Sequence, residues 1–211
     1  MLAAASPTAL VQQTREKLID AAGPVFAEHG FHKATVREIT DRAGANVAAV
    51  NYHFRDKAEL YAECLRAAQC TAMEAAGECE CPSEAARDRL RHFIDRMVRR
   101  LLNPNRPKWH HAIMSREMLE PSGALDQLVE RGIRPDCQEL MEIIEDLAGE
   151  KVSRDRTFLL GFSVVSQCLF FLQNRPIIER LYPKYNSKPP AVEELVEHIY
   201  VFSLAGIRAA K

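Results

Sequence analysis

A stretch between residues 35 and 57, TVREITDRAGANVAAVNYHFRDK, holds side chains that are suited to contacts with double-stranded DNA. The amide of Asn51 can make a bidentate contact with an adenine edge, and Val47 or Ala48 can meet a thymine methyl group. Groups suited to phosphate oxygens surround these three, namely Thr35, Arg37, Tyr52, His53 and Lys57. The pattern predicts phosphate contacts that fix orientation and a few base contacts that give sequence preference.

The cysteines suggest a different chemistry, a metal site or a redox sensor. The chain has six of them, Cys64, Cys70, Cys79, Cys81, Cys137 and Cys168. Zinc sites commonly use two cysteines separated by two to four residues, and the Cys79-x-Cys81 spacing matches that pattern poorly. His110 and His111 are adjacent, so on a helix they would point in different directions. A cysteine-based sensor stays open as an alternative, and without an export signal we expect reduced thiols in the cytoplasm.

Enzymatic chemistry has no recognisable signature in this chain. We find no nucleophile motif, no phosphate-binding loop and no H-E-x-x-H motif in the sequence. We therefore predict that the protein is not an enzyme and needs no cofactor or metal. A helical adaptor protein that never touches DNA is the remaining alternative.

The elements that would position these residues are all helical, because the apolar residues recur with a period near 3.6. Helices are predicted over 14–29, 36–43, 47–52, 56–76, 84–102, 107–119, 122–148, 154–173, 176–181 and 190–209. Thr14 is a plausible N-cap and Gly30 a plausible stop for the first of them. Thr35 and Glu38 have capping-box spacing at the start of the second helix.

Two short helices around Gly44 match a helix-turn-helix. At 100° per residue, Ala49 and Val50 face one side of the helix over 47–52 and could pack on Ile39 and Phe26. Polar groups and small side chains occupy the opposite side, which suits close approach to a major groove. This is the geometry expected of a recognition helix.

Composition limits the class of protein. The chain has 211 residues, 28 basic against 29 acidic, and a net charge of −1. Hydrophobic residues make up 47% and charged residues 27%, which is typical of globular domains. The apolar run over 158–172 is short for a membrane span. Residues 1–57 hold seven basic and six acidic residues, so we expect weak non-specific DNA binding and strong dependence on dimerisation.

The order of these motifs resembles the TetR family of bacterial transcriptional regulators. The resemblance covers residues 14 to about 65, through TREKLIDAA, FAEHGF, TVREITDRAGA and NYHFRDKAELY. The rest of the chain resembles the ligand-binding domain of the CecR-like subgroup, through SREMLEPSGALD, RPD and HIYVFSLAGIR.

The resemblance implies an all-α homodimer that binds a palindromic operator in the cytoplasm, most often as a repressor, and is released by a small molecule. The expected organisation is a disordered tail (1–13), a DNA-binding domain (14–60) and a ligand-binding and dimerisation domain (61–211). Positions 46–51 would face bases, which adds Asn46 to the DNA-binding set. Asn51 stands where many relatives carry a tyrosine, so no particular base preference is transferred.

Two further sets of residues are predicted for the C-terminal domain. The ligand set combines aromatic and Met residues with a few polar groups, as apolar pockets do, and comprises Phe93, Met97, Trp109, His110, Met114, Arg116, Glu117 and Phe162. The dimer set follows stripes on the last two long helices and comprises Phe158, Phe162, Val165, Leu169, Leu172, Leu195, Ile199 and Phe202.

Overall fold

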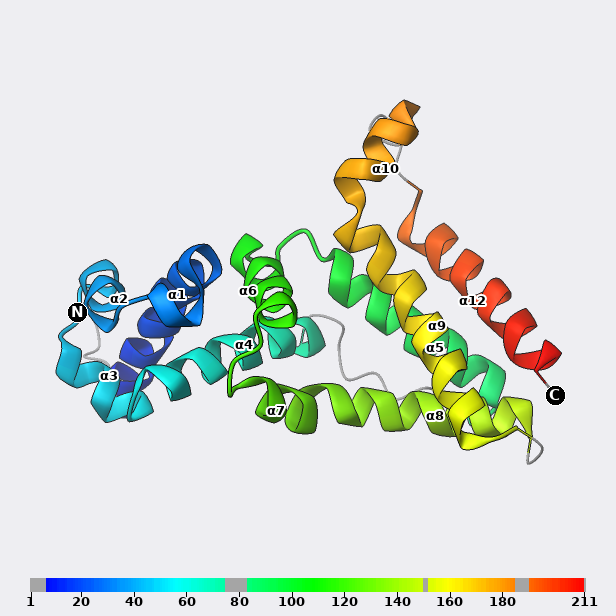
Figure 1. Cartoon of the computed structure of the whole chain (residues 1–211), viewed down its shortest axis with the longest axis horizontal. Helices are drawn as coiled ribbons and strands as arrows, with labels where there is room; N and C mark the ends of the chain where they lie inside the picture. The colour runs from blue at the N-terminus through cyan, green and yellow to red at the C-terminus, as the bar shows by residue number, and fades with distance from the viewer. Residues whose placement is uncertain (1–6, 75–82, 150–151, 185–189, 211) are drawn as a thin grey trace, which may run out of the picture. The chain divides into compact units, whose positions relative to one another are not determined.

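A computed structural model describes residues 7–74, 83–149, 152–184 and 190–210, and these residues form helices without any strand (Figure 1). The helices are α1 (Pro7–Lys33), α2 (Val36–Ala43), α3 (Val47–Phe54), α4 (Lys57–Glu74), α5 (Ala86–Leu102), α6 (Lys108–Leu119), α7 (Leu125–Leu128), a π-helical turn η1 (Val129–Ile133), α8 (Arg134–Ala148), α9 (Arg154–Gln173), α10 (Arg175–Leu181) and α12 (Val192–Ala209). The predicted all-α fold is confirmed.

The chain folds into two compact units. The N-terminal unit comprises the described residues up to Thr71 together with Asn105–Ile133, and the C-terminal unit comprises the remainder. The predicted domain boundary at residue 60 falls inside α4, and α6 packs in the N-terminal unit against α1. The helix-turn-helix therefore packs in one unit with the later segment Asn105–Ile133.

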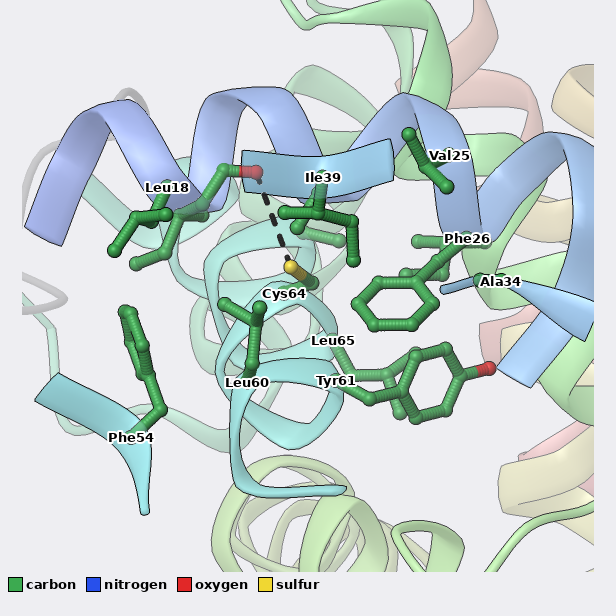
Figure 2. Packing of buried hydrophobic residues seen from close by; sticks show 14 of the residues in the cluster. Leu18, Val25, Phe26, Ala34, Ile39, Phe54, Leu60, Tyr61, Cys64 and Leu65 are labelled. Atoms are coloured by element: carbon green, nitrogen blue, oxygen red, sulfur yellow. Dashed lines mark hydrogen bonds between the residues drawn. The ribbon is translucent and has the colours of Figure 1, made fainter. Parts of the chain in front are cut away.

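The core of the N-terminal unit holds the helix-turn-helix in place (Figure 2). Leu18 and Phe26 of α1, Ile39 of α2 and Leu60 of α4 are all fully buried in one cluster. The Phe26 ring meets the Tyr61 ring edge-on, with centroids 4.8 Å apart. Burial of these side chains supplies most of the free energy that positions α2 and α3.

The ends of α1 differ in part from the prediction. The helix begins at Pro7, so residues 7–13 are helical and not a disordered tail, and the Thr14 hydroxyl donates to the Leu10 carbonyl (2.9 Å) in place of capping. The segment TALVQQ carries mostly helix formers and no breaker, which favours this earlier start. Gly30 interrupts α1 with φ 75° and ψ 170°, as its predicted role as a stop requires.

The predicted helix over 122–148 is also divided. α7 passes through the π-helical turn η1 before α8 begins at Arg134. Pro135 stands at the second position of α8, where it cannot donate a backbone hydrogen bond and where its ring crowds the carbonyl four residues earlier. A widened turn accommodates such an interruption without ending the helical path.

The C-terminal unit is built from α5, α8, α9 and α12 around one apolar cluster. Its α9 is long and apolar enough to cross a membrane, with a mean hydropathy of 1.3 over its most apolar window. One helix with this composition is weak evidence for a span, because the core helices of globular proteins have the same composition. α9 contributes Val164 and Cys168 to the unit's buried core.

Candidate DNA-binding site

Side-chain caps define the two helices of the helix-turn-helix. Thr35 caps α2 by accepting from the Glu38 N–H (3.2 Å), as its capping-box spacing predicts. Gly44 ends α2 in the left-handed region. Asn46 caps α3 by accepting from the Ala49 N–H (2.8 Å). The Asn46 amide oxygen, predicted to face bases, is therefore used within the protein.

The two faces of α3 match the predicted division. Val50 is fully buried and Phe54 is 2% exposed, both inside the N-terminal core. Val47 and Tyr52 are 49% and 74% exposed, and Ala48 and Asn51 are exposed beside them. An exposed face of small and hydrogen-bonding side chains on a rigidly packed helix suits major-groove readout.

The predicted phosphate-contacting residues fall into an exposed group, Thr35, Arg37 and Tyr52, and a half-buried group, His53 and Lys57. Thr35, Arg37 and Tyr52 are exposed, and the Arg37 guanidinium has no hydrogen-bond or ion-pair partner among the described residues. His53 is half-buried and meets the Tyr52 ring edge-on at 5.0 Å. Thr35, Arg37 and Tyr52 are thus accessible to an anionic partner as the chain stands.

Lys57 differs, because its ammonium group already has partners. Its Nζ donates to the carbonyls of Phe31 (2.8 Å) and Ala34 (3.1 Å) and lies 4.7 Å from the centroid of the Phe31 ring. These carbonyls belong to the end of α1 and the segment after it, where helical hydrogen bonding stops. The phosphate role of Lys57 stays a prediction, whereas its role as a backbone cap is a feature of the structure.

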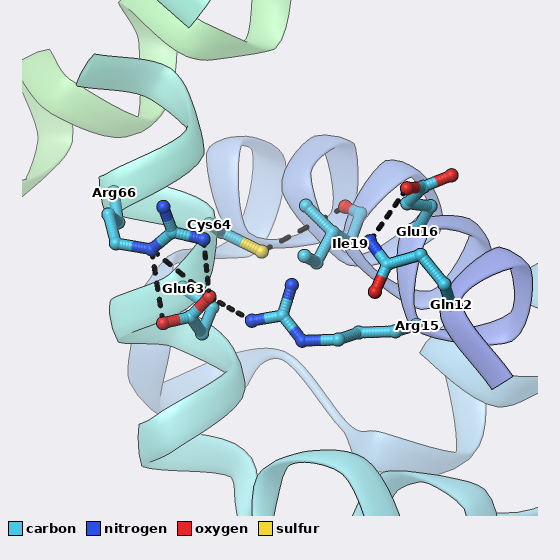
Figure 3. Close-up of polar contacts among 7 residues, drawn as sticks. All are labelled: Gln12, Arg15, Glu16, Ile19, Glu63, Cys64 and Arg66. Carbon is cyan, nitrogen blue, oxygen red and sulfur yellow. Dashed lines mark hydrogen bonds and ion pairs between the residues drawn. The ribbon is translucent and has the colours of Figure 1, made fainter. Parts of the chain in front are cut away.

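An ion-pair cluster joins α1 to α4 beside the end of α3 (Figure 3). Glu63 accepts from Arg15 and from Arg66 (2.8 Å), and the Arg15 guanidinium lies 5.2 Å from the centroid of the Phe54 ring. Burial alone would raise the pKa of Glu63, but hydrogen bonds from the two arginines lower it below its usual range. The cluster keeps Glu63 ionised and holds α4 against α1.

Three predicted ligand residues of α6 make structural contacts in the N-terminal unit. Trp109 lies so close to Gly23 of α1 that a Cβ atom there would collide with the indole ring. The Arg116 guanidinium donates to the carbonyls of Ala27 (3.3 Å) and Glu28 (3.1 Å) near the end of α1. Met114 packs against the same core, so Trp109, Met114 and Arg116 contribute to the seating of α6 on the helix-turn-helix unit.

Glu117 of α6 is fully buried and accepts three hydrogen bonds. The Tyr61 hydroxyl of α4 donates to its Oε2 (2.7 Å), and the Ser122 N–H and hydroxyl donate to its Oε1 (both 2.9 Å). Burial and the nearby carboxylate raise the pKa of Tyr61 far above its usual range, so the phenol stays a donor. This network ties α4, α6 and the following loop together.

The predicted ligand residues are divided between the two units. His110 is 2% exposed in the N-terminal unit, where burial and the charge of Arg106 lower its pKa to about 4. Phe93 and Met97 lie in the core of the C-terminal unit, whereas Phe162 is 57% exposed on α9. The eight residues therefore do not share one core, and their contact with a ligand stays a prediction.

The predicted dimer residues separate into buried and exposed groups. Leu195 and Ile199 are 5% and 0% exposed, so they pack inside their own chain and cannot form a partner contact as predicted. Phe202 is 65% exposed and Phe162 57%, while Phe158, Val165, Leu169 and Leu172 are half-buried. The prediction omitted three exposed apolar residues, Leu159, Phe170 and Val201. Counting one helical turn back from Phe162 would have found Leu159, whereas Val201 is adjacent to Phe202 and lies about 100° around the helix from it.

The cysteines offer little support for a sensor. Cys64 and Cys168 are buried, Cys137 is half-buried, and Cys79 and Cys81 lie outside the described residues, as does the side chain of Cys70. Within the described ranges no group of three or more His, Cys, Asp or Glu residues could hold a metal ion.

We predict that Cys168 and Cys64 react slowly with iodoacetamide in the folded protein. Burial raises the pKa of the Cys168 thiol to about 12, which reduces its thiolate fraction about a thousandfold relative to an ordinary cysteine. Peptide mass spectrometry at pH 8 measures alkylation at each site, with urea-unfolded protein as the control. Equal rates for Cys168 in the folded and the unfolded protein would contradict the prediction.

Comparisons with known proteins agree with this geometry. Residues 18–64 match the family described as bacterial regulatory proteins of the tetR family, and residues 86–207 match the C-terminal domain of the HTH-type transcriptional dual regulator CecR. The chain is 30% identical to that regulator from Shigella flexneri over 173 residues, which covers 76% of each protein.

Solved structures share the fold. A protein from Pseudomonas aeruginosa PAO1 described as a transcriptional regulator has a TM-score of 0.69 at 22% identity, covering 95% of each chain. The hemolysin II transcriptional regulator HlyIIR has a TM-score of 0.59 at 21% identity, covering 91% of this chain and 97% of its own. With its helix-turn-helix, its capped recognition helix and a C-terminal domain of the CecR type, the chain belongs to the TetR family of ligand-responsive, DNA-binding transcriptional regulators.

Proposed function

We propose that this regulator binds a palindromic operator as a homodimer in the cytoplasm, acts as a repressor and is released by a small molecule. The observation that carries the proposal is the exposed face of α3. Val47, Ala48 and Asn51 are exposed on this face, while Val50 and Phe54 are buried on the other side of the helix. Arg37 and Tyr52 lie near this face with groups that suit phosphate oxygens.

An exposed apolar surface on α9 and α12 supports the dimer. Leu159, Phe162 and Phe170 of α9 and Val201 and Phe202 of α12 are each 50–65% exposed. Exposed apolar residues gathered on neighbouring helices mark interaction surfaces, and α9 packs against α12 within the chain. A second copy of the same surface would cover it through a two-fold interface.

A two-fold dimer presents two α3 helices, which must lie about 34–36 Å apart to enter successive major grooves. A ligand that binds preferentially to a conformation with another separation would release the DNA, to the extent that its affinities for the two conformations differ. The CecR-type C-terminal domain is where we place this ligand, whose identity is open.

The Asn51→Ala variant tests the assignment of the recognition helix. We expect the difference in affinity between operator and unrelated DNA to shrink by about 1–3 kcal/mol, because a bidentate base contact is lost. Melting temperature should not change, since the Asn51 side chain is exposed. Gel-shift titrations on the DNA upstream of the gene, with a shuffled sequence of equal length, measure the discrimination.

Asp41→Asn is a suitable control, because it alters an exposed residue of α2 and leaves every base-contacting position of α3 unchanged. It should leave the discrimination between the two DNAs unchanged. If Asn51→Ala binds both DNAs as the wild type does, the assignment of α3 is wrong. If the wild type itself does not bind the upstream DNA better than the shuffled one, the operator proposal for that DNA fails.

A further inference from the structure

The segment that joins the recognition helix to α4 has a strained backbone at an exposed arginine. Arg55 has φ 65° and ψ −53°, and within the described ranges it is the one residue other than glycine with a positive φ. The Asp56 N–H donates to the Phe54 carbonyl across 2.7 Å, so Arg55 is the centre of a three-residue γ-turn with positive φ. An L-residue is disfavoured in this conformation, whereas glycine adopts it readily.

Both neighbours of Arg55 prevent the turn from relaxing. Phe54 is 2% exposed in the core on one side. Asp56 on the other side caps α4 by accepting from the Glu59 N–H (2.9 Å). The surrounding structure therefore fixes the strained conformation, which is the circumstance in which strain signals a functional constraint.

The Arg55 side chain makes no contact that would explain this conformation. It is exposed, and its guanidinium has no hydrogen-bond or ion-pair partner in the described part of the chain. It follows directly after α3, three residues beyond the exposed Tyr52. An unpaired guanidinium at the end of a recognition helix is suited to a bidentate contact with a phosphate.

The ammonium group of the neighbouring Lys57 already donates hydrogen bonds to backbone carbonyls. The three donors of Lys57 have three carbonyl acceptors, on Phe31 (2.8 Å), Ala34 (3.1 Å) and His32 (3.4 Å). A phosphate could reach this ammonium group only by replacing bonds to backbone oxygens around the end of α1. Lys57 is thus placed to stabilise the fold.

We propose that Arg55 is the cation that binds a DNA phosphate at the end of the recognition helix, and that Lys57 acts as a structural cap of α1. The inference rests on the proposed operator binding, and it moves the phosphate contact from Lys57 to Arg55. The guanidinium supplies a favourable contact that a glycine in the same turn could not make.

The test is a salt titration of DNA affinity, by fluorescence anisotropy between 50 and 200 mM KCl, with melting curves for each variant. Arg55→Gln and Arg55→Gly should lower the slope of log affinity against log salt by about 0.9 per subunit, or about 1.8 for a dimer. Over that fourfold salt range, wild-type affinity should fall about twelvefold more than that of either variant.

The remaining variants distinguish the loss of a phosphate contact, seen in the salt slope, from a loss of stability, seen in the melting temperature. Arg55→Gly should melt at or above the wild-type temperature because it relieves the turn, and Arg55→Lys should restore the wild-type slope. Lys57→Gln should lower the melting temperature. Its salt slope should equal that of the wild type when DNA affinity is measured well below the melting temperature of this variant. Arg87→Gln removes an exposed arginine of the C-terminal unit and should change neither quantity.

Two results would overturn the inference. One is an Arg55→Gln variant with the wild-type slope, and the other is a Lys57→Gln variant with a reduced slope and an unchanged melting temperature. If the wild type shows no salt-dependent DNA binding, the proposed function fails as well, which the wild-type curve alone reveals. The capping role of Lys57 is still decided by its melting curve in that case.

Discussion

Replacing Phe202 by Asp is expected to give a folded monomer that binds the operator at least a hundredfold more weakly than the wild type. Phe202 is 65% exposed on α12, so the change costs the single chain little stability. In the proposed dimer the same residue would be buried, and a carboxylate there would be desolvated without a partner. Losing the dimer removes the second half-site contact, which is worth about 10²–10⁴ in affinity when two sites are linked.

Light scattering at micromolar concentration and operator titrations measure the two effects. Leu119→Asp is a matched control, since Leu119 is 83% exposed at the end of α6, outside the α9 and α12 surface. It should remain dimeric and bind the operator normally. A Phe202→Asp variant with the mass of a dimer would show that this part of α12 does not form the interface.

Replacing Glu117 by Leu should destabilise the N-terminal unit by roughly 3–5 kcal/mol. The leucine fills most of the space but leaves three donors from Tyr61 and Ser122 without an acceptor. An unsatisfied donor costs about 1–3 kcal/mol when it is buried, as the Tyr61 hydroxyl is, and less at the half-buried Ser122. Burial, the largest cause of the raised pKa of Tyr61, remains in this variant, so the phenol keeps its proton and its unsatisfied donor.

Urea unfolding followed by far-ultraviolet circular dichroism measures this loss. Glu117→Gln should cost less than about 1.5 kcal/mol, because an amide oxygen still accepts from Ser122 and an amide and a phenol can still pair. Tyr61→Phe should fall between the two variants. Equal stability of the Gln and Leu variants would show that the hydrogen bonds contribute little and that side-chain volume alone matters.

Local signals in the sequence were sufficient for most of the fold. The N-cap at Thr35 and the stop at Gly30 act within a few residues, so their partners are close in sequence and could be predicted. Helical periodicity placed Val50 on the packed side of α3 and Val47 and Asn51 on the other side, and the exposures of these three residues agree with that division.

Interactions between distant segments could not be predicted in this way. The hydrogen-bond partners of Lys57 lie 23–26 residues away in the sequence. A lysine at this position suits a phosphate contact as well as a helix cap, so residue type alone does not distinguish the two roles. Trp109 and Glu117 have the chemistry of ligand-binding residues, yet their partners Gly23 and Tyr61 are in the helix-turn-helix unit. Ile199 follows the same apolar stripe as Phe202, and only the packed structure separates core from surface.

The seating of Trp109 on Gly23 limits how freely this regulator can be recombined. A chimera that exchanges only the DNA-binding domain assumes that this domain packs independently of the rest of the chain. In this chain the absence of a side chain at Gly23 of α1 leaves room for the indole ring of Trp109 from α6. Arg116 of α6 also donates a hydrogen bond to a backbone carbonyl near the end of α1. A graft that exchanges only the first 60 residues would separate these pairs, whereas one that carries α6 with its own α1 would preserve them.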